Sequence, residues 1–170
     1  MRHSYLRCLA KAALWALAAA TAPAWATPDS LTTAAVCTPA SYETIRGGLV
    51  LVAEGAVRAG RNPPVLEYIC PVWNPEDYAA SPSWHFLKLQ YRDASRGGGA
   101  VRATLFEKSR ASGRSERMLV LSSGQSAEVA VVAARLPRGL DFSRHAYYVL
   151  LELESRTLAP EAHMVMLTDK

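Results

Sequence analysis

The sequence predicts an all-β fold, an antiparallel β-sandwich of Greek-key or jelly-roll-like type with about seven or eight strands and one disulfide bond. First, apolar and polar residues alternate with a period of two in several short segments, which is typical of half-buried antiparallel strands. Second, clusters of glycine, proline, serine and asparagine separate these segments, as turns require. Third, two cysteines follow the N-terminal segment, and an even number in an exported chain favours a disulfide.

Residues 1–26 have the organisation of a secretory signal peptide. The segment begins with basic side chains and no acid, an apolar run follows at 12–20, and Ala24 and Ala26 flank Trp25. This pattern predicts cleavage after Ala26 and a periplasmic or secreted protein. The apolar run is about half of the roughly 20 residues that a membrane-spanning helix needs, so we expect no stable membrane insertion.

The charge of the chain does not favour nucleic acid as a partner. The formal net charge is +4, but three of the basic residues lie in the signal peptide, and the other 144 residues carry 16 basic and 15 acidic side chains. A protein that binds nucleic acid usually presents a clear excess of positive charge. The apolar content of 50% also excludes a disordered chain. No motif implies a cofactor.

The processed chain divides into an N-terminal tail at 27–40 and one β-sandwich domain at 41–170. Cys37 and Cys70 are its two cysteines. We expect them to form a disulfide, which would stabilise the fold by about 3–4 kcal/mol through the loop that it closes.

The predicted strands follow one another to the end of the chain. They lie at 49–52, 66–72, 84–91, 101–106, 117–121, 126–136, 147–154 and 164–168. Turn residues separate them at 61–64, 74–75, 81–82, 97–99, 112–113, 122–124 and 137–139. In the second segment Leu66, Tyr68 and Cys70 share a face, so the disulfide points inward. Segment 126–136 fits both a helical and an alternating pattern, and the all-β context favours a strand.

Three short motifs and a late strand resemble a loose group of small exported bacterial β-sandwich proteins. The motifs are Cys37-Thr38-Pro39, Gly47-Gly48 and Cys70-Pro71-Val72, and the strand begins with Tyr147-Tyr148-Val149-Leu150. The resemblance implies the fold and the exported location, and it brings no activity or ligand with it.

The sequence carries no recognisable catalytic or metal motif. The serine-rich segment 122–126 lacks the Gly-x-Ser-x-Gly pattern that exposes a nucleophile. His85, His145 and His163 are not spaced as metal ligands, so no metal site is predicted. A hydrolase would need His145 or His163 beside an acid in a cleft.

Aromatic residues gather in the proline-rich segment 71–84. Trp73, Tyr78 and Trp84 stand there among prolines and polar residues. Such side chains can stack on a glycan or dock a protein, since they offer a large area at a low entropic cost. The alternative is that both tryptophans pack at the edge of the core.

Arginine-rich turns form the second candidate surface. Arg96 lies in a predicted loop near 95–99, and Arg110 and Arg114 lie in the next loop, near 109–116. If both turns meet at one end of the sandwich, their guanidinium groups would suit an anionic component of the cell envelope. The alternative is two separate, solvated loops.

These features predict an exported binding or interaction module whose partner is a protein or a glycan. Two other classes remain open. One is a structural subunit of a surface assembly that donates residues 27–36 as a strand to another copy. The other is a hydrolase.

Overall fold

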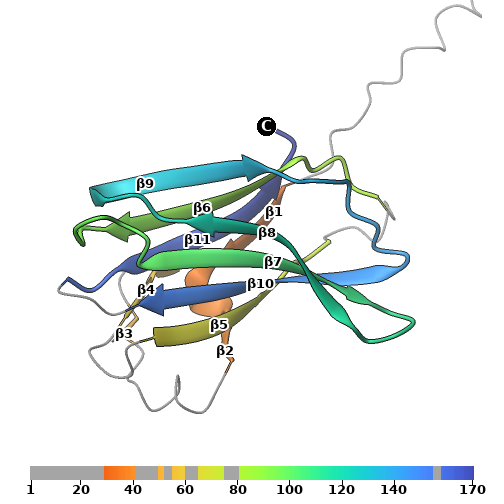
Figure 1. The fold of residues 1–170 in the computed structure, drawn as a ribbon, viewed down its shortest axis with the longest axis horizontal. Coiled ribbons are helices and arrows are strands. Elements are labelled where there is room, and N and C mark those ends of the chain that lie inside the picture. The colour runs from red at the N-terminus through yellow and green to blue at the C-terminus, as the bar shows by residue number, and fades with distance from the viewer. Residues whose placement is uncertain (1–28, 41–49, 52–54, 60–64, 75–80, 155–157) are drawn as a thin grey trace, which may run out of the picture.

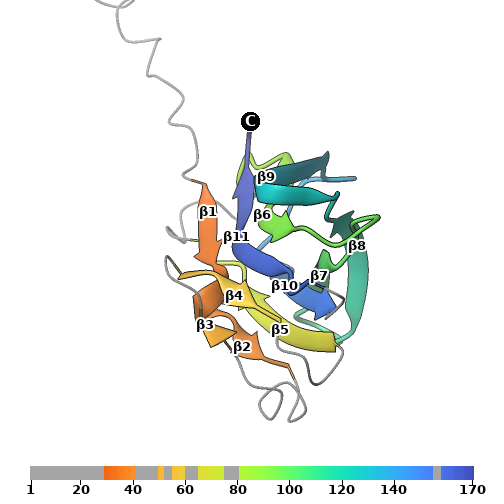
Figure 2. The ribbon, with the colours of Figure 1, turned by 90° about the vertical axis from the view of Figure 1, so that its left-hand side faces the viewer.

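The computed structural model describes residues 29–40, 50–51, 55–59, 65–74, 81–154 and 158–170. They form two antiparallel β-sheets that pack face to face, which confirms the predicted β-sandwich (Figures 1 and 2). The first sheet has the order β3-β4-β11-β6-β9, with β1 paired to β11, and the second has the order β2-β5-β10-β7-β8. No helix among the described residues is long and apolar enough to cross a membrane. The predicted signal peptide lies outside these residues.

Within the described residues, seven strands of seven or more residues carry the sandwich, and four shorter strands come from the N-terminal part of the chain. The long strands are β5 (Val65–Pro71), β6 (Phe86–Asp93), β7 (Val101–Ser109), β8 (Ser115–Ser122), β9 (Ser126–Arg135), β10 (His145–Glu154) and β11 (Glu161–Thr168). The short ones are β1 (Ser30–Thr33), β2 (Thr38–Pro39), β3 (Val50–Leu51) and β4 (Val57–Arg58), and a 3-10 turn, η1 (Ala34–Val36), follows β1.

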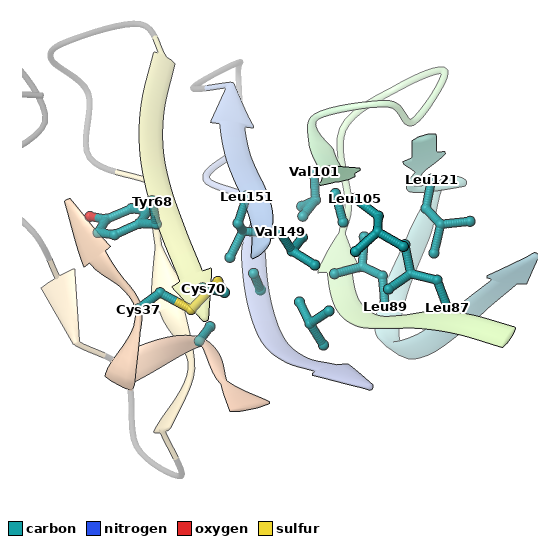
Figure 3. Packing of buried hydrophobic residues seen from close by; sticks show 14 of the residues in the cluster. Cys37, Tyr68, Cys70, Leu87, Leu89, Val101, Leu105, Leu121, Val149 and Leu151 are labelled. Atoms are coloured by element: carbon teal, nitrogen blue, oxygen red, sulfur yellow. A yellow bond between two sulfur atoms is a disulfide. The ribbon is translucent and has the colours of Figure 1, made fainter. Parts of the chain in front are cut away.

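The core forms from the alternate residues of the facing strands. In β6 every second side chain is buried, beginning with Leu87 and Leu89, and the same alternation buries Val149 and Leu151 in β10. Figure 3 shows these side chains meeting between the sheets. Burial of a leucine side chain stabilises a fold by about 1.5–3 kcal/mol relative to exposure, so this double row is a main source of stability.

The ambiguous segment 126–136 is a strand, as predicted from its all-β context. Strand β9 pairs with β6 along most of its length, and Ala130, Val132 and Ala134 pack against the core at a spacing of two. The pairing with β6 satisfies the backbone of this segment, and the alternation rather than the helical spacing gives the residues that face the core.

The expected tail at 27–40 is part of the sandwich over most of its described length. Strand β1 pairs with β11, from Ser30 opposite Leu167 to Thr33 opposite Met164. The chain then crosses between the sheets, because β2 pairs with β5 of the second sheet. The tail prediction was therefore wrong here: alternate residues of 30–33 are buried, and their backbone completes the edge of β11.

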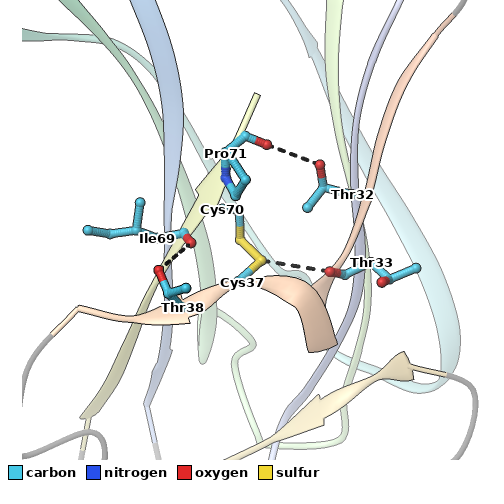
Figure 4. The surroundings of a disulfide bond; sticks show 7 residues. All are labelled: Thr32, Thr33, Cys37, Thr38, Ile69, Cys70 and Pro71. Atoms are coloured by element: carbon cyan, nitrogen blue, oxygen red, sulfur yellow. Dashed lines mark hydrogen bonds between the residues drawn. A yellow bond between two sulfur atoms is a disulfide. The ribbon is translucent and has the colours of Figure 1, made fainter. Parts of the chain in front are cut away.

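The predicted disulfide joins Cys37 to Cys70 at this crossing. The two Cα atoms lie 4.3 Å apart, and the bond spans 33 residues of sequence. Figure 4 shows the hydroxyl of Thr32 donating to the carbonyl of Pro71 at 3.1 Å beside the bond. Both cysteines are buried, so the bond points inward as expected from the phase of β5.

Candidate functional site

The structure separates the two described aromatic residues of segment 71–84. Trp73 is 68% exposed, whereas Trp84 is 1% exposed and its ring meets that of Phe142 edge to face at 6.1 Å. The prediction of Trp84 as a contact residue was therefore wrong, because this side chain precedes β6 and packs at the end of the core. Tyr78 lies outside the described residues. Trp73 stays available as a contact residue.

Trp73 extends the outer side of strand β5. The amide of Val72 donates to the carbonyl of Tyr147 at 3.3 Å, so the pairing of β5 with β10 continues beyond Pro71. Val72 packs against the core. Because side chains alternate along an extended chain, the ring of Trp73 lies on the outer side of the sheet, with Pro71 and Ile69.

Two further aromatic rings lie on the same outer side. Phe106 of β7 and Tyr148 of β10 are directly opposite each other, and their rings stack with centroids 5.2 Å apart and planes 11° from parallel. Tyr148 is also opposite Pro71 of β5. Pro71, Tyr148 and Phe106 therefore form one row across three strands, with Trp73 beside its β5 end. We call Trp73, Phe106 and Tyr148 the aromatic face.

The neighbouring rows of this sheet change from apolar to polar. In the next row Leu150 lies between Ile69 and Thr104, and the row after it places Glu152 between Glu67 and Arg102. Arg102 Nη1 lies 3.5 Å from Glu152 Oε1. The outer surface of the second sheet thus combines stacked rings, an apolar strip and a line of hydrogen-bonding groups on one regular sheet.

The arginine-rich turns do not form one patch. Arg96 lies in the connection before β7, and Arg110 and Arg114 lie in the turn after it, so the two groups are at opposite ends of that nine-residue strand (Figure 1). A strand of this length extends about 30 Å. The condition for a joint anionic site is not met, because one strand cannot bring both of its ends together. Arg114 is instead part of a cleft at its own end.

The serine-rich segment 122–126 has a structural role. Ser123 is buried, and its hydroxyl donates to Asp93 Oδ2 at 2.6 Å and accepts from the amide of Val101 at 3.0 Å. Asp93 also accepts from the amide of Ala100 at 3.0 Å, and from the amide and hydroxyl of Ser95. This carboxylate therefore fastens the glycine turn 97–99 to the start of β7 and the end of β8.

The pKa of Asp93 lies below its ordinary value. Burial acts to raise this pKa, but the hydrogen bonds from Ser123, Ser95 and Ala100 together outweigh it. An ionised carboxylate held in this way acts as a fixed acceptor, and Ser123 is not exposed as a nucleophile.

The histidines do not assemble a catalytic centre among the described residues. His163 Nε2 lies 3.6 Å from Glu161 Oε2, but that carboxylate is held by Arg58 and Arg92 from the two neighbouring strands. His145 lines a cleft together with Glu107 and Glu116, so the structure does place a histidine and acids in one cleft, as a hydrolase would need. Within the described part of the chain, however, no hydrogen bond joins His145 to a serine hydroxyl. A nucleophile paired with its base is thus not formed there.

Sequence reasoning missed Phe106 and Tyr148. They are distant in the chain, and only the register of β7 with β10 brings them together. The alternation of apolar and polar residues could have indicated them. Phe106 and Tyr148 are aromatic residues at outward positions of their strands, where polar side chains are expected.

Comparisons with known proteins find solved structures of low similarity and no family. No protein-family model and no curated protein matches the chain. A family two carbohydrate esterase from Cellvibrio japonicus is similar over 84% of this chain, which spans 34% of the esterase chain, with a TM-score of 0.45 and 10% identity. The CBM36-1 domain of a multidomain xylanase from the hindgut metagenome of Trinervitermes trinervoides is similar over 82% of this chain and 94% of its own, with a TM-score of 0.45 and 11% identity. A family 29 carbohydrate binding module gives coverages of 84% and 90%, a TM-score of 0.44 and 6% identity.

Proposed function

We propose that the protein is an exported, non-catalytic module that binds a glycan chain across the outer side of the second sheet. The observation that carries the proposal is the aromatic face, in which an indole ring exposed by 68% lies two residues after Pro71, and Pro71 shares a row with a stacked pair of rings. Exposed aromatic rings on a soluble protein offer a large contact area, and few rotatable bonds are frozen when a ligand covers them.

The polar row beside the rings supports a glycan as the occupant. Carboxylates of Glu67 and Glu152 accept hydrogen bonds and the guanidinium of Arg102 donates them, so sugar hydroxyl groups can find both kinds of partner. The rows run across several strands, which suits an extended polymer lying on a sheet. The disulfide and the predicted signal peptide support an oxidising, exported location.

Replacing the exposed indole tests the proposal. We expect Trp73→Ala to weaken binding of a soluble polysaccharide at least tenfold, because central aromatic contacts at interfaces often cost about 2 kcal/mol or more when truncated. Retardation of the processed protein in native gels cast with β-glucan, xylan, mannan or chitosan would reveal the ligand, and calorimetry would give its affinity.

Val131→Ala is the matched control, since Val131 is 54% exposed on the other sheet. Its affinity should equal that of the unchanged protein. If the polysaccharide gel retards Trp73→Ala as strongly as it retards the control, the aromatic face is not the binding site. Unfolding of Trp73→Ala would show that the indole is part of the core, and the proposal would fail in that case too.

Strand β9 favours a second candidate, an assembly subunit. It ends the first sheet in the described order, and Val129 and Val131 are about half exposed along its ten residues. A long apolar edge strand is a template for pairing with another chain. The native mass of the processed protein decides between the candidates: a monomer favours the binding module, and a ladder favours the subunit, in which Val131→Lys should abolish the higher species.

A further inference from the structure

We propose a second ligand site, separate from the aromatic face, that takes one small neutral polyol such as a single sugar residue. It is a cleft of about 320 Å³ on the inner side of the β7–β8 hairpin, where this hairpin and the start of β10 lie at one end of the sandwich (Figure 1). We call it the hairpin cleft. Its volume is near the lower limit of the roughly 300–1,000 Å³ typical of small-molecule sites.

Rigid strands place the polar groups of the cleft. Glu107 of β7 is directly opposite Glu116 of β8, and Ser109 is directly opposite His145 of β10. The turn between the strands is closed by the amide of Ser109, which donates to the carbonyl of Arg114 at 2.9 Å. The amide of Arg110 adds a bond of 2.9 Å to the carbonyl of Arg144, which ties this turn to the chain before β10. The side chains therefore converge without a rearrangement of the backbone.

The charges of the cleft disfavour simple ions. Two glutamates facing each other repel an anion. Arg114 in the lining and Arg138, which binds Glu107, carry positive charges that weaken the attraction of these glutamates for a cation. Among the residues that the structure describes, no group of three histidine, cysteine or acidic side chains is arranged to hold a metal ion. A neutral ligand fits this balance better than either kind of ion.

Donors and acceptors alternate around the cleft. The carboxylates accept hydrogen bonds, Arg114 donates them, and the hydroxyls of Ser109, Ser112 and Ser115 do both. A ligand that carries several hydroxyl groups, each of which donates and accepts, is complementary to such a lining. An apolar ligand would leave these groups without partners, at about 1–3 kcal/mol for each one that is buried.

The His145 ring supplies a further donor. Its Nδ1 atom is buried and has no hydrogen-bond partner. A buried N–H group without an acceptor is rarer than a partnerless lone pair, so we assign the proton to Nε2. That nitrogen is then the one that can donate to a ligand in the cleft, and the site gains a directional contact beside the carboxylates.

Binding of single polyols tests the hairpin cleft. Glucose, galactose, mannose and myo-inositol would be titrated separately into the isotope-labelled processed protein, with the ring signals of His145 and the amides of Ser112 and Ser115 followed by NMR. We expect at least one polyol to shift these signals in a saturable way. His145→Gln and Glu116→Gln should each weaken that binding at least tenfold, and the exposed Glu116 keeps the test valid if the histidine variant unfolds.

Two control variants show whether polyol binding is specific to the hairpin cleft. His85→Gln changes an exposed histidine that does not line the cleft, and Glu128→Gln makes the same change as Glu116→Gln at an exposed position of β9; both should bind the polyol with unchanged affinity. Four titrations without shifts at these signals would overturn the proposal. The proposal would also be overturned if His145→Gln and Glu116→Gln bound the polyol as tightly as the unchanged protein does. The same holds if acetate, phosphate or Ca²⁺, and not the polyols, shifted these NMR signals. None of these results depends on whether a polysaccharide binds the aromatic face.

Discussion

Replacing Asp93 by asparagine should destabilise the fold by about 2–4 kcal/mol at neutral pH. The substitution keeps the shape of the side chain but turns one of the two accepting oxygens into an amide nitrogen. Each oxygen accepts from one backbone amide, that of Ser95 at 3.1 Å or that of Ala100 at 3.0 Å, and from one hydroxyl. The hydroxyl can rotate to another acceptor, but the amide cannot, and a buried unpaired amide costs about 1–3 kcal/mol. Loss of the carboxylate charge weakens the two remaining bonds as well.

The pH dependence of the unfolding free energy gives a second, independent test of this prediction. The pKa of folded Asp93 lies below its ordinary value, so ionisation stabilises the fold above the unfolded pKa of about 3.9. This stabilisation is lost as the pH falls through the lower, folded pKa. Asp93→Asn has no such proton to bind, so the difference in unfolding free energy between the two proteins should narrow below about pH 4.

Urea unfolding at several pH values, followed by far-ultraviolet circular dichroism, measures both effects. Asp169→Asn, near the C-terminus, is the control and should change the free energy of unfolding by less than about 0.5 kcal/mol. A loss below about 1 kcal/mol for Asp93→Asn would show that the four hydrogen bonds are not formed. A loss that stays constant down to about pH 3 would refute the assignment of a lowered pKa.

Three further changes test other parts of the fold. Reduction of the Cys37–Cys70 bond should lower the free energy of unfolding by about 4 kcal/mol, because the closed loop spans 33 residues. Glu161→Gln should cost about 2–4 kcal/mol at neutral pH, since two guanidinium groups lose a buried partner whose charge they hold. Burial raises the pKa of Glu161, but the bonds from the two arginines lower it overall, so this loss should shrink below about pH 4. Gly98→Ala should prevent normal folding of its turn, since a Cβ atom there would lie 2.7 Å from the carbonyl carbon of Gly124.

The two substitutions each have a control within the chain. Glu152→Gln removes a surface ion pair and should cost less than about 1 kcal/mol. Gly97→Ala introduces the same positive-φ strain as Gly98→Ala but meets no atom within 4 Å, so it should cost only about 1–2 kcal/mol. Urea midpoints of each pair compare them directly. Equal midpoints within a pair, or an unchanged midpoint after reduction, would contradict the corresponding argument.

The period of the sequence predicted the sandwich because burial alternates along strands such as β5, β6 and β10. It located the inward face of β5 and the disulfide in it, since Leu66, Tyr68 and Cys70 share one phase. It could not separate Trp73 from Trp84, because the sequence does not show that the pairing of β5 continues past Pro71, as the bond from the amide of Val72 to the carbonyl of Tyr147 does, or that Trp84 lies before its strand begins. What decides there is how the chain closes the end of the core, and this depends on contacts such as that of Trp84 with Phe142.

The candidate sites were harder to predict than the fold for a related reason. The aromatic face depends on the register between β7 and β10, and the hairpin cleft depends on the pairing of β7 with both of its neighbours. Register is set by the whole of the buried face rather than by any short motif. The tail at 27–40 was missed because the buried residues of β1, Ser30 and Thr32, are polar, so this segment lacks the apolar alternation that indicates a strand.

The position of β11 has a consequence for how the protein matures. The last strand of the chain is also the centre of the first sheet, where it pairs with β1, β4 and β6. During vectorial synthesis of the exported chain that we propose, β1 and β4 would leave the ribosome and the translocation pore long before the strand that pairs with them. The first sheet can therefore close only after β11 has been delivered, and until then the N-terminal strands would be a substrate for chaperones and proteases.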